Sequence, residues 1–158
     1  MDSTAAATGP SPTGTRAEVL GARPELAAAH ERLMDTLWAG SVSPVTLELC
    51  RLRMATLLGS QVALTERTPA ALAAGLTEER IGRLSLWATD PSFTAEERAC
   101  IAFAEQFVLD HDHISADDVH QLTELLTPEG VVTFTTALIT WENQHRFDNA
   151  LRIAAAEG

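Results

Sequence analysis

Four polar side chains in one short segment of the sequence are candidates for chemistry. Glu48 could act as a general acid or base if it faced an apolar pocket, because burial away from water raises the pKa of a carboxyl group. Ser60 and Gln61 follow a glycine at an expected helix start, where backbone N–H groups can hold an anion and these side chains can orient a substrate. Arg67 could bind a carboxylate or an enolate as a fixed cation. Together they would suit acid–base chemistry on a small carbonyl or carboxylate compound.

Each candidate in this segment also has a structural interpretation. Arg51, itself a candidate for binding substrate, and Arg53 lie near enough to Glu48 along one helix to pair with its carboxylate. Arg67 could instead pair at the surface with Glu66 or another acid. The two residues at the helix start could simply cap it. The sequence leaves these alternatives open.

A second polar stripe is expected on the last helix. Its members follow the i, i+3, i+4, i+7 spacing that places side chains on one helix face: Glu142, His145, Arg146 and Asn149. His145 could exchange protons with a substrate, and Arg146 could anchor an acidic one. Alternatively the stripe forms an interface, or Glu142 and Arg146 form an intrahelical pair, which typically stabilises a helix by about 0.3–0.5 kcal/mol.

The sequence predicts neither a metal site nor a bound cofactor. Residues 111–113 (HDH) lie beside Asp110 without a recognised ligand spacing, which predicts a solvated acidic loop. The spacing of Cys50 and Cys100 does not make a redox motif. Each lies in an apolar helical context, where a cysteine usually behaves as a small buried hydrophobic residue.

Helix caps and apolar periodicity predict an all-α chain. Ser, Thr and Pro recur at typical N-cap and first-turn positions, and no alternating strand pattern of useful length occurs. Three tryptophans are expected in the core or at an interface: Trp38, Trp87 and Trp141. The expected helices cover residues 24–39, 44–58, 60–74 with a kink at Pro69, 78–88, 94–109, 115–126 and 128–155.

The chain has 158 residues, which suits one domain with a substantial core. Residues 1–21 are rich in Ala, Ser, Thr, Gly and Pro and are expected to form a flexible tail before a domain over residues 22–158. No apolar run reaches the roughly 18 residues that a membrane span needs, and no signal peptide is recognised. We therefore expect a cytoplasmic protein.

The charge balance is acidic. The formal net charge is −11, and arginine provides all the fixed positive charge because the chain lacks lysine. Nucleic acids and anionic membranes attract clustered basic residues, so neither is an expected partner. Scarce Lys and Asn together with abundant Ala indicate a GC-rich coding sequence, as in actinobacteria, where a biosynthetic pathway would be a suitable setting.

Several motifs together resemble the carboxymuconolactone decarboxylase/AhpD-like family. They are residues 48–53 (ELCRLR) with the helix ending at Gly75, 75–81 (GLTEERI), 93–99 (FTAEERA) and 143–147 (NQHRF). The resemblance extends from about residue 24 to residue 153. It implies an AhpD-like helical fold of about six to seven helices, which assembles into trimers, hexamers or dimers with active sites near subunit interfaces.

The sequence departs from the family at the residues that carry its redox chemistry. In the redox members a glutamate precedes a C-x-x-C motif, and a histidine follows four positions later. Here Glu48 is retained, whereas Ser60, Ala63 and Arg67 occupy the other places. A thiol peroxidase needs two cysteines within bonding reach, so this activity is not expected. The decarboxylase branch has a histidine near the start of this helix, which Arg67 replaces.

The leading hypothesis is a non-redox lyase, isomerase, dehydratase or cyclase without a cofactor. Glu48 would be the acid or base and Arg67 the anion stabiliser, while Ser60, Gln61 and His145 would orient the small-molecule substrate. The alternative is a catalytically silent oligomeric binding or scaffold protein, in which Glu48 forms a salt bridge. A third alternative is residual peroxidase activity through Cys50.

Overall fold

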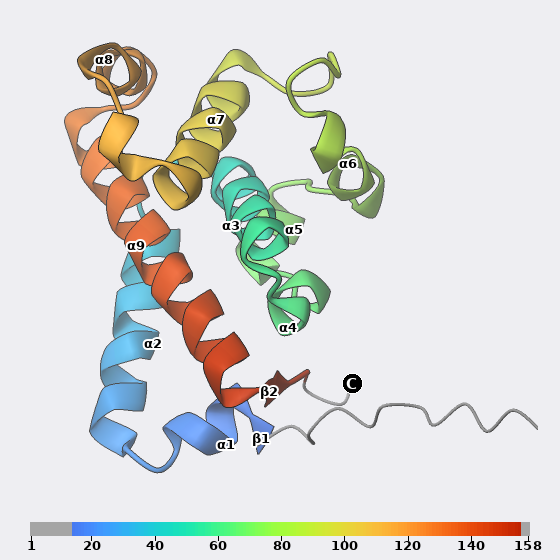
Figure 1. Ribbon diagram of the computed structural model, residues 1–158, viewed down its shortest axis with the longest axis vertical. Coiled ribbons are helices and arrows are strands. Elements are labelled where there is room, and N and C mark those ends of the chain that lie inside the picture. Colours follow the sequence, from blue (N-terminus) through green and yellow to red (C-terminus); the bar gives the residue numbers. More distant parts are fainter. Residues whose placement is uncertain (1–13, 156–158) are drawn as a thin grey trace, which may run out of the picture.

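The structure is a computed structural model that describes residues 14–155, and nearly all of its regular structure is helical (Figure 1). The helices are α1 (Arg16–Leu20), α2 (Pro24–Trp38), α3 (Pro44–Leu58), α4 (Gln61–Thr65), α5 (Pro69–Ala73), α6 (Glu78–Gly82), α7 (Ala95–Leu109), α8 (Ala116–Leu125) and α9 (Pro128–Leu151). Two 3₁₀ turns (Leu84–Leu86 and His111–His113) and two short strands, β1 (Gly14–Thr15) and β2 (Ile153–Ala154), complete it. The predicted all-α fold class is confirmed.

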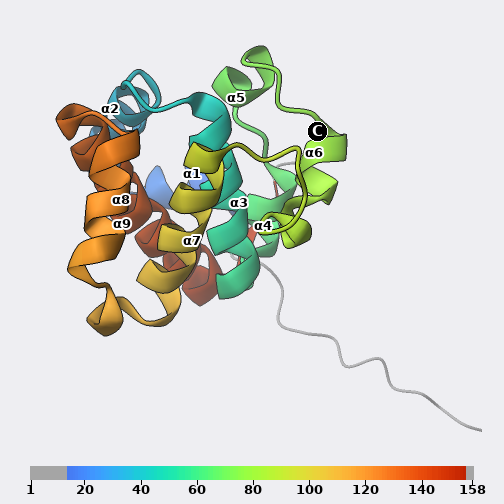
Figure 2. The same ribbon diagram turned by 90° about the horizontal axis from the view of Figure 1, so that it is seen from above.

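Helix α3 lies at the centre of the molecule. Apolar residues are distributed around the whole helix, and the residues from Val45 to Leu52 are buried without interruption, as expected for a helix surrounded by others. Seen from above, α2, α8 and α9 lie on one side of it and α5 and α6 on the other (Figure 2). It begins with Pro44 in its first turn and ends at Gly59, whose φ of +69° suits glycine. The core around it includes Phe93, Phe134 and Trp141.

The capping residues recognised in the sequence start the outer helices. Thr94 and Glu97 form a reciprocal capping box at α7, and Ser115 and Asp118 form another at α8. The Thr127 side chain accepts a hydrogen bond from the third residue of α9. These predicted starts are confirmed.

Two of the predicted helices between residues 60 and 88 are shorter than predicted. A single helix over residues 60–74 is wrong, because Glu66 and Thr68 adopt extended conformations between α4 and α5. Pro69 disfavours a helical residue before it and fits the first turn of a new helix. Similarly, the helix expected over 78–88 ends at Gly82, and a 3₁₀ turn follows. A continuous helix would have used the backbone N–H and C=O groups of these connecting segments in its own hydrogen bonds. Because the helices are interrupted, these groups can bind side chains instead.

The two ends of the described chain pair with each other. Residues 1–13 of the expected tail lie outside the described residues, but for residues 14–21 the prediction of a flexible tail is wrong. Gly14 pairs with Ile153 in a parallel β1–β2 arrangement, and Thr15 and Glu18 form a capping box at α1. α9 ends at Leu151, before the expected residue 155, so that β2 can form.

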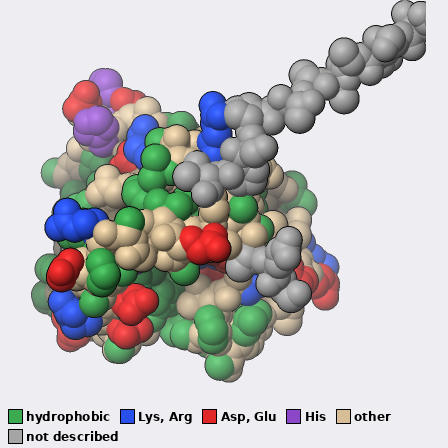
Figure 3. All heavy atoms as spheres, turned by 90° about the horizontal axis from the view of Figure 1, so that it is seen from below, with side chains coloured by type: hydrophobic (Ala, Val, Ile, Leu, Met, Phe, Trp, Pro, Cys, Tyr) green, Lys and Arg blue, Asp and Glu red, His purple; other side chains and the backbone are tan. Residues whose placement is uncertain are grey.

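Over residues 14–155, none of the helices combines the length and the apolar character that crossing a bilayer requires. At the end of the molecule that carries α1, hydrophobic side chains are interspersed with acidic and basic ones (Figure 3).

Candidate active site

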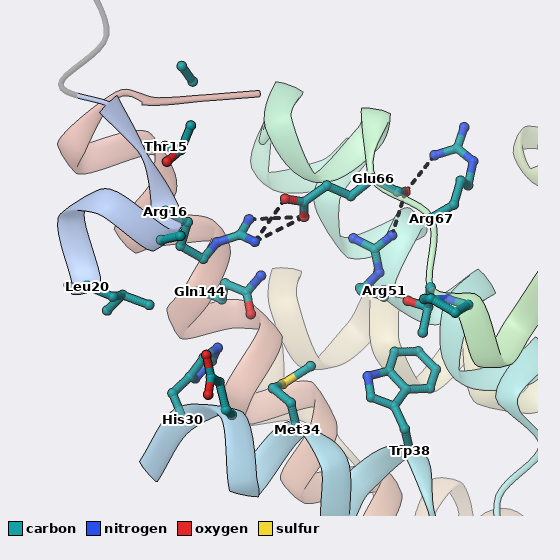
Figure 4. Close-up of a pocket in the computed structure, with 15 residues that line it drawn as sticks. Thr15, Arg16, Leu20, His30, Met34, Trp38, Arg51, Glu66, Arg67 and Gln144 are labelled. Carbon is teal, nitrogen blue, oxygen red and sulfur yellow. Dashed lines mark hydrogen bonds and ion pairs between the residues drawn. The ribbon is translucent and has the colours of Figure 1, made fainter. Parts of the chain in front are cut away.

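A cavity of about 490 Å³ lies between α1, α2, the α4–α5 connection and α9 (Figure 4). Met34 and Trp38 of α2 and Leu20 of α1 provide apolar walls. Its polar lining comes from six elements spread along the sequence: Thr15, Arg16, His30, Glu31, Arg51, Glu66, Arg67, Thr68 and Gln144. A cavity of this size and mixed lining suits a small organic molecule.

The buried pair of Glu48 and Arg51 forms the wall of this cavity on the side of α3. Arg51 Nη2 lies 2.7 Å from Glu48 Oε1, and its Nε lies 2.8 Å from Oε2. Thr68 donates to the same carboxylate through its hydroxyl (2.8 Å) and its backbone N–H (3.3 Å). Arg51 lines the cavity, whereas Glu48 is fully buried behind it. The ion pair that the sequence analysis gave as the alternative interpretation of Glu48 is therefore present.

The environment of Glu48 keeps its carboxyl group ionised. Burial alone would raise its pKa, but the hydrogen bonds and charge of Arg51, with the hydrogen bonds of Thr68, outweigh burial and lower the pKa below its ordinary value. The condition under which the pKa of Glu48 would rise, an apolar pocket around its carboxyl group, is not met, because a guanidinium group occupies the position next to it. Glu48 holds Arg51 in place and does not itself reach the cavity.

Arg51 retains one unused hydrogen-bond donor. A guanidinium group carries five N–H bonds. Two of them go to Glu48, and two go to the carbonyl oxygens of Ala63 and Glu66, each at 3.0 Å. One N–H on Nη1 has no acceptor among the described residues. It can donate to the oxygen of a bound molecule.

Arg67 lies at the edge of the cavity and is paired. It binds Glu78 through Nε (2.7 Å) and Nη2 (3.0 Å), and its Nη1 donates to the carbonyl oxygens of Leu64 and Glu66. Its acidic partner is thus Glu78, one of the alternatives that the sequence left open. The carboxylate of Glu66 turns to the opposite side, toward Arg16 (Figure 4).

Arg16 is a site residue that the sequence analysis missed. It lies 2.7 Å from Asp148 of α9 and 2.9 Å from Glu66, so it links α1 to two other elements at the cavity. The side chain of Asp148 is fully buried. The Thr15–Glu18 spacing was a usable signal, because it matches a capping box and indicates a helix where a tail was expected.

His145 and Ser60 lie behind the cavity wall. His145 is fully buried, its Nε2 lies 3.3 Å from the carbonyl oxygen of Arg51, and its Nδ1 has no partner within the described chain. Burial, reinforced by the charge of Arg51, lowers its pKa to about 4, so the ring is neutral at neutral pH. Ser60 is fully buried at the start of α4, and its hydroxyl makes no capping bond. Neither lines the cavity.

Two further candidates lie on the surface away from the cavity lining. Gln61 is exposed on α4. Arg146 is 60% exposed and lies 2.7 Å from Glu142, one turn earlier on α9. The intrahelical pair predicted as an alternative is present. Among the seven residues proposed from the sequence, only Arg51 and Arg67 line the cavity.

His30 and Gln144 line the cavity without hydrogen-bond partners in the described part of the chain. The Gln144 Oε1 atom is buried and unpaired. His30 comes from α2, and Figure 4 places it on a different side of the cavity from Arg51. The spacing of His30 in the sequence could have indicated its position. It lies four residues after Leu26 and three before Leu33, so it shares their face of an amphipathic helix. Trp38 is only partly buried, so it serves as cavity wall as well as core.

Both cysteines are buried and reduced. Burial, with nearby acidic groups, raises the pKa of the Cys50 thiol well above its ordinary value and that of Cys100 to about 12. Among the described residues no group of three potential ligands could hold a metal ion, and His113 pairs with Asp110 on the surface. The burial of both cysteines agrees with their interpretation as small hydrophobic residues of the core.

The sequence matches the family model described as "Carboxymuconolactone decarboxylase family" over residues 24–106. No curated protein shows significant sequence similarity. The arrangement of helices is similar to that of several solved structures.

An Agrobacterium tumefaciens protein, described as an AhpD-type antioxidant-defence protein of unknown function, is 21% identical with a TM-score of 0.78, over 91% of this chain and 99% of that one. The debrominase Bmp8, solved in complex with 2,3,4-tribromopyrrole, is 17% identical with a TM-score of 0.71, over 87% of this chain and 74% of that one. An uncharacterised peroxidase-related protein from Ralstonia eutropha JMP134 with an AhpD core is 13% identical with a TM-score of 0.75, over 88% and 75%. At these identities the similarity establishes the AhpD-like fold.

Proposed function

The chain belongs to the carboxymuconolactone decarboxylase family, and we propose on that basis that it is a non-redox enzyme acting on a small carbonyl compound in the cavity. The proposal rests on two groups on different walls of the cavity that have no hydrogen-bond partner within residues 14–155. They are one N–H of Arg51 and the imidazole of His30. The reaction class is proton transfer next to a carbonyl group, as in an isomerase or a lyase.

Arg51 would polarise the carbonyl group of the substrate. Its free N–H can donate to the carbonyl oxygen and bind it more strongly as negative charge develops. The guanidinium group is already fixed by Glu48 and by two backbone carbonyls, so little reorganisation is needed when the oxyanion forms. Glu48 is a positioning residue in this scheme.

His30 would be the general acid–base group. An imidazole is the side chain best suited to exchange protons near neutral pH. It would take a proton from the carbon next to the carbonyl, leaving an enolate whose oxygen is held by Arg51. Return of the proton to another carbon gives isomerisation, and loss of a group from the neighbouring carbon gives elimination. Gln144, with an unpaired amide oxygen, would orient a donor group of the substrate.

The charges around the cavity favour a neutral carbonyl compound over a carboxylate. Three arginines are paired with four carboxylates: Arg16 with Glu66 and Asp148, Arg51 with Glu48, and Arg67 with Glu78. This cluster has one more negative than positive charge. A carboxylate ligand would have to displace one of these pairs, so Arg67 is a weaker anion site than its position in the sequence suggested.

The buried cysteines support a non-redox reaction. A peroxidatic cysteine must be an accessible thiolate, whereas Cys50 is fully buried with a raised pKa. Ser60 and Ala63 offer no thiol at the positions where the redox members carry theirs. The reactions for which the debrominase and the peroxidase-related protein are named would therefore need a reactive group other than these cysteines in this chain.

The second candidate function is a catalytically silent binding protein. The salt bridge between Glu48 and Arg51 favours it, because a paired carboxylate is what an inactive scaffold would retain. In either case we propose that the protein assembles into a homo-oligomer, an expectation that rests on its family.

Proton exchange in deuterated water tests the enzyme proposal. The wild-type protein is incubated with a panel of cavity-sized ketones, 3-oxo esters and unsaturated lactones, and loss of the proton signals next to the carbonyl is followed by NMR. We expect exchange with at least one compound, and a reduction of about 10²–10⁴-fold in His30→Asn, the usual range for loss of a general acid–base group.

The matched control is His120→Asn, since His120 is an exposed histidine on α8 that pairs with Glu124. Equal exchange rates in His30→Asn and wild type would reject His30 as the base. Binding of panel compounds without exchange of any of them would favour the silent binding protein.

A further inference from the structure

A second cavity of about 350 Å³ adjoins the first. The two cavities have four lining residues in common: Arg16, Leu20, His30 and Gln144. These residues come from α1, α2 and α9, so both cavities lie in the same space between these helices. A molecule bound in the first cavity can extend past His30 and Gln144 into the second.

One part of the second cavity is apolar. Beyond the shared residues its lining consists of Leu26 and Leu33 of α2 and Phe147 of α9, with Thr140 and Asn143 beside them. We call Leu26, Leu33 and Phe147 the apolar annex. Leu26 is 54% and Leu33 38% exposed, so these large side chains remain in contact with water. An apolar group that covered them would be stabilised by the hydrophobic effect.

We propose that the substrate is amphiphilic, with a carbonyl head group at Arg51 and an unbranched apolar tail in the apolar annex. This inference rests on the proposed function, because the head group is the carbonyl compound inferred there. His30 and Gln144 lie between the two parts and contact the atoms where the head joins the tail. The tail is the group that the annex selects, since its three defining side chains offer no hydrogen bond.

A homologous series of ligands tests this substrate class. Binding of the 2-alkanones from 2-butanone to 2-decanone is measured by calorimetry with the full chain. Each added methylene that enters the annex should tighten binding about three- to fourfold, as expected for the burial of one methylene group. The gain should stop once the tail fills the annex.

Two variants locate the tail. Leu33→Asn and Leu26→Asn place a polar group in the annex at partly exposed positions, where the fold tolerates the change. Both should remove most of the dependence on tail length while leaving the affinity for 2-butanone within about twofold. The control is Leu72→Asn, since Leu72 is similarly exposed (46%) on α5 and lines neither cavity.

Three outcomes would overturn the proposal. One is an affinity independent of tail length in the wild-type protein, and another is the same dependence in both annex variants and in wild type. The third is that the wild-type protein is an oligomer, that Leu33→Asn dissociates it, and that the affinity does not depend on tail length. A second copy of the chain would then cover the annex. If the affinity depends on tail length but no compound exchanges its protons, only the proposed reaction is rejected. If compounds exchange their protons but the affinity does not depend on tail length, only the amphiphilic substrate is rejected.

Discussion

Arg51 can bind a ligand because its charge is neutralised by Glu48, whose carboxylate does not line the cavity. A buried guanidinium group without a partner is costly, and removal of one member of a buried ion pair typically destabilises a protein by about 3–5 kcal/mol. Here one carboxylate takes two of the N–H bonds, two backbone carbonyls take two more, and the remaining one has no acceptor among the described residues. The pair thus stabilises the fold and orients a donor at the same time.

The burial of His145 predicts a specific loss of stability in acid. Its pKa is about 4 in the folded protein, beside Arg51, Asp148 and Arg16, against about 6.5 in an unfolded chain. Between these values the unfolded state binds one more proton, so the stabilising effect of the neutral ring is complete above about pH 6.5 and is lost as the pH falls toward 4. From pH 7 to pH 5 the loss should be about 2 kcal/mol.

Urea unfolding of wild type and His145→Gln across this pH range measures the effect. Glutamine can donate to the same Arg51 carbonyl but does not titrate, so the variant should lack this part of the pH dependence. His120→Gln, at an exposed position, should retain it. An unchanged pH dependence in His145→Gln would show that His145 is not held neutral by the fold.

At the scale of the elements, the β1–α1 segment is held to the rest of the molecule by few contacts. α1 has no buried residue, and it is attached by contacts with α2, by the short β1–β2 pairing and by Arg16. Arg16 is 18% exposed and binds the fully buried carboxylate of Asp148 and the partly exposed one of Glu66. This segment closes one side of the cavity, because Thr15, Arg16, Ala17 and Leu20 line it.

Arg16→Met should therefore release this segment. Loss of the guanidinium group leaves Asp148 buried without its cation, which should lower the free energy of unfolding by about 3 kcal/mol. Hydrogen exchange, followed by mass spectrometry, should accelerate in residues 14–20 far more than in α3. The matched variant is Arg83→Met, since Arg83 forms an exposed pair with Glu79 and its loss should cost under 1 kcal/mol. Unchanged exchange in residues 14–20 would mean that the β1–β2 pairing and the contacts with α2 hold the segment without Arg16.

What the sequence predicted well depends on local interactions. Thr94 and Ser115 cap their helices through residues three positions away, so a short pattern contains both partners. The cavity could not be predicted in this way. Arg16 reaches Asp148 across 132 residues, and no spacing rule connects His30 to Arg51. Family resemblance supplied the fold and the position of Glu48, but the role of Glu48 depends on the side chains that surround it.

At the scale of the whole molecule, the cysteines report on the integrity of the core. Cys50 of α3 and Cys100 of α7 are both fully buried, and α3 and α7 pack against each other. With thiol pKa values raised by burial, neither should react with iodoacetamide at about pH 8 on the timescale on which a free thiol does. Both should become reactive together in urea, at the midpoint of global unfolding, as mass spectrometry would show.

Rapid modification of Cys50 in the native protein would contradict this prediction and would revive a thiol-based activity. The exposed reference is a Ser→Cys variant at Ser92, an exposed residue of the loop before α7, which should react in the folded state. Buried thiols that react only on unfolding would leave acid–base chemistry as the reaction class to pursue.

The pairing of β1 with β2 also has a consequence for the order of folding. It closes a loop that contains almost the entire described chain, and the entropy lost on closing a loop increases with its length. Helices such as α3 and α7 can form and pack before that loop closes, because their contacts are closer in sequence. We therefore expect the cavity wall built from β1 and α1 to be completed late in folding, after the core has become native.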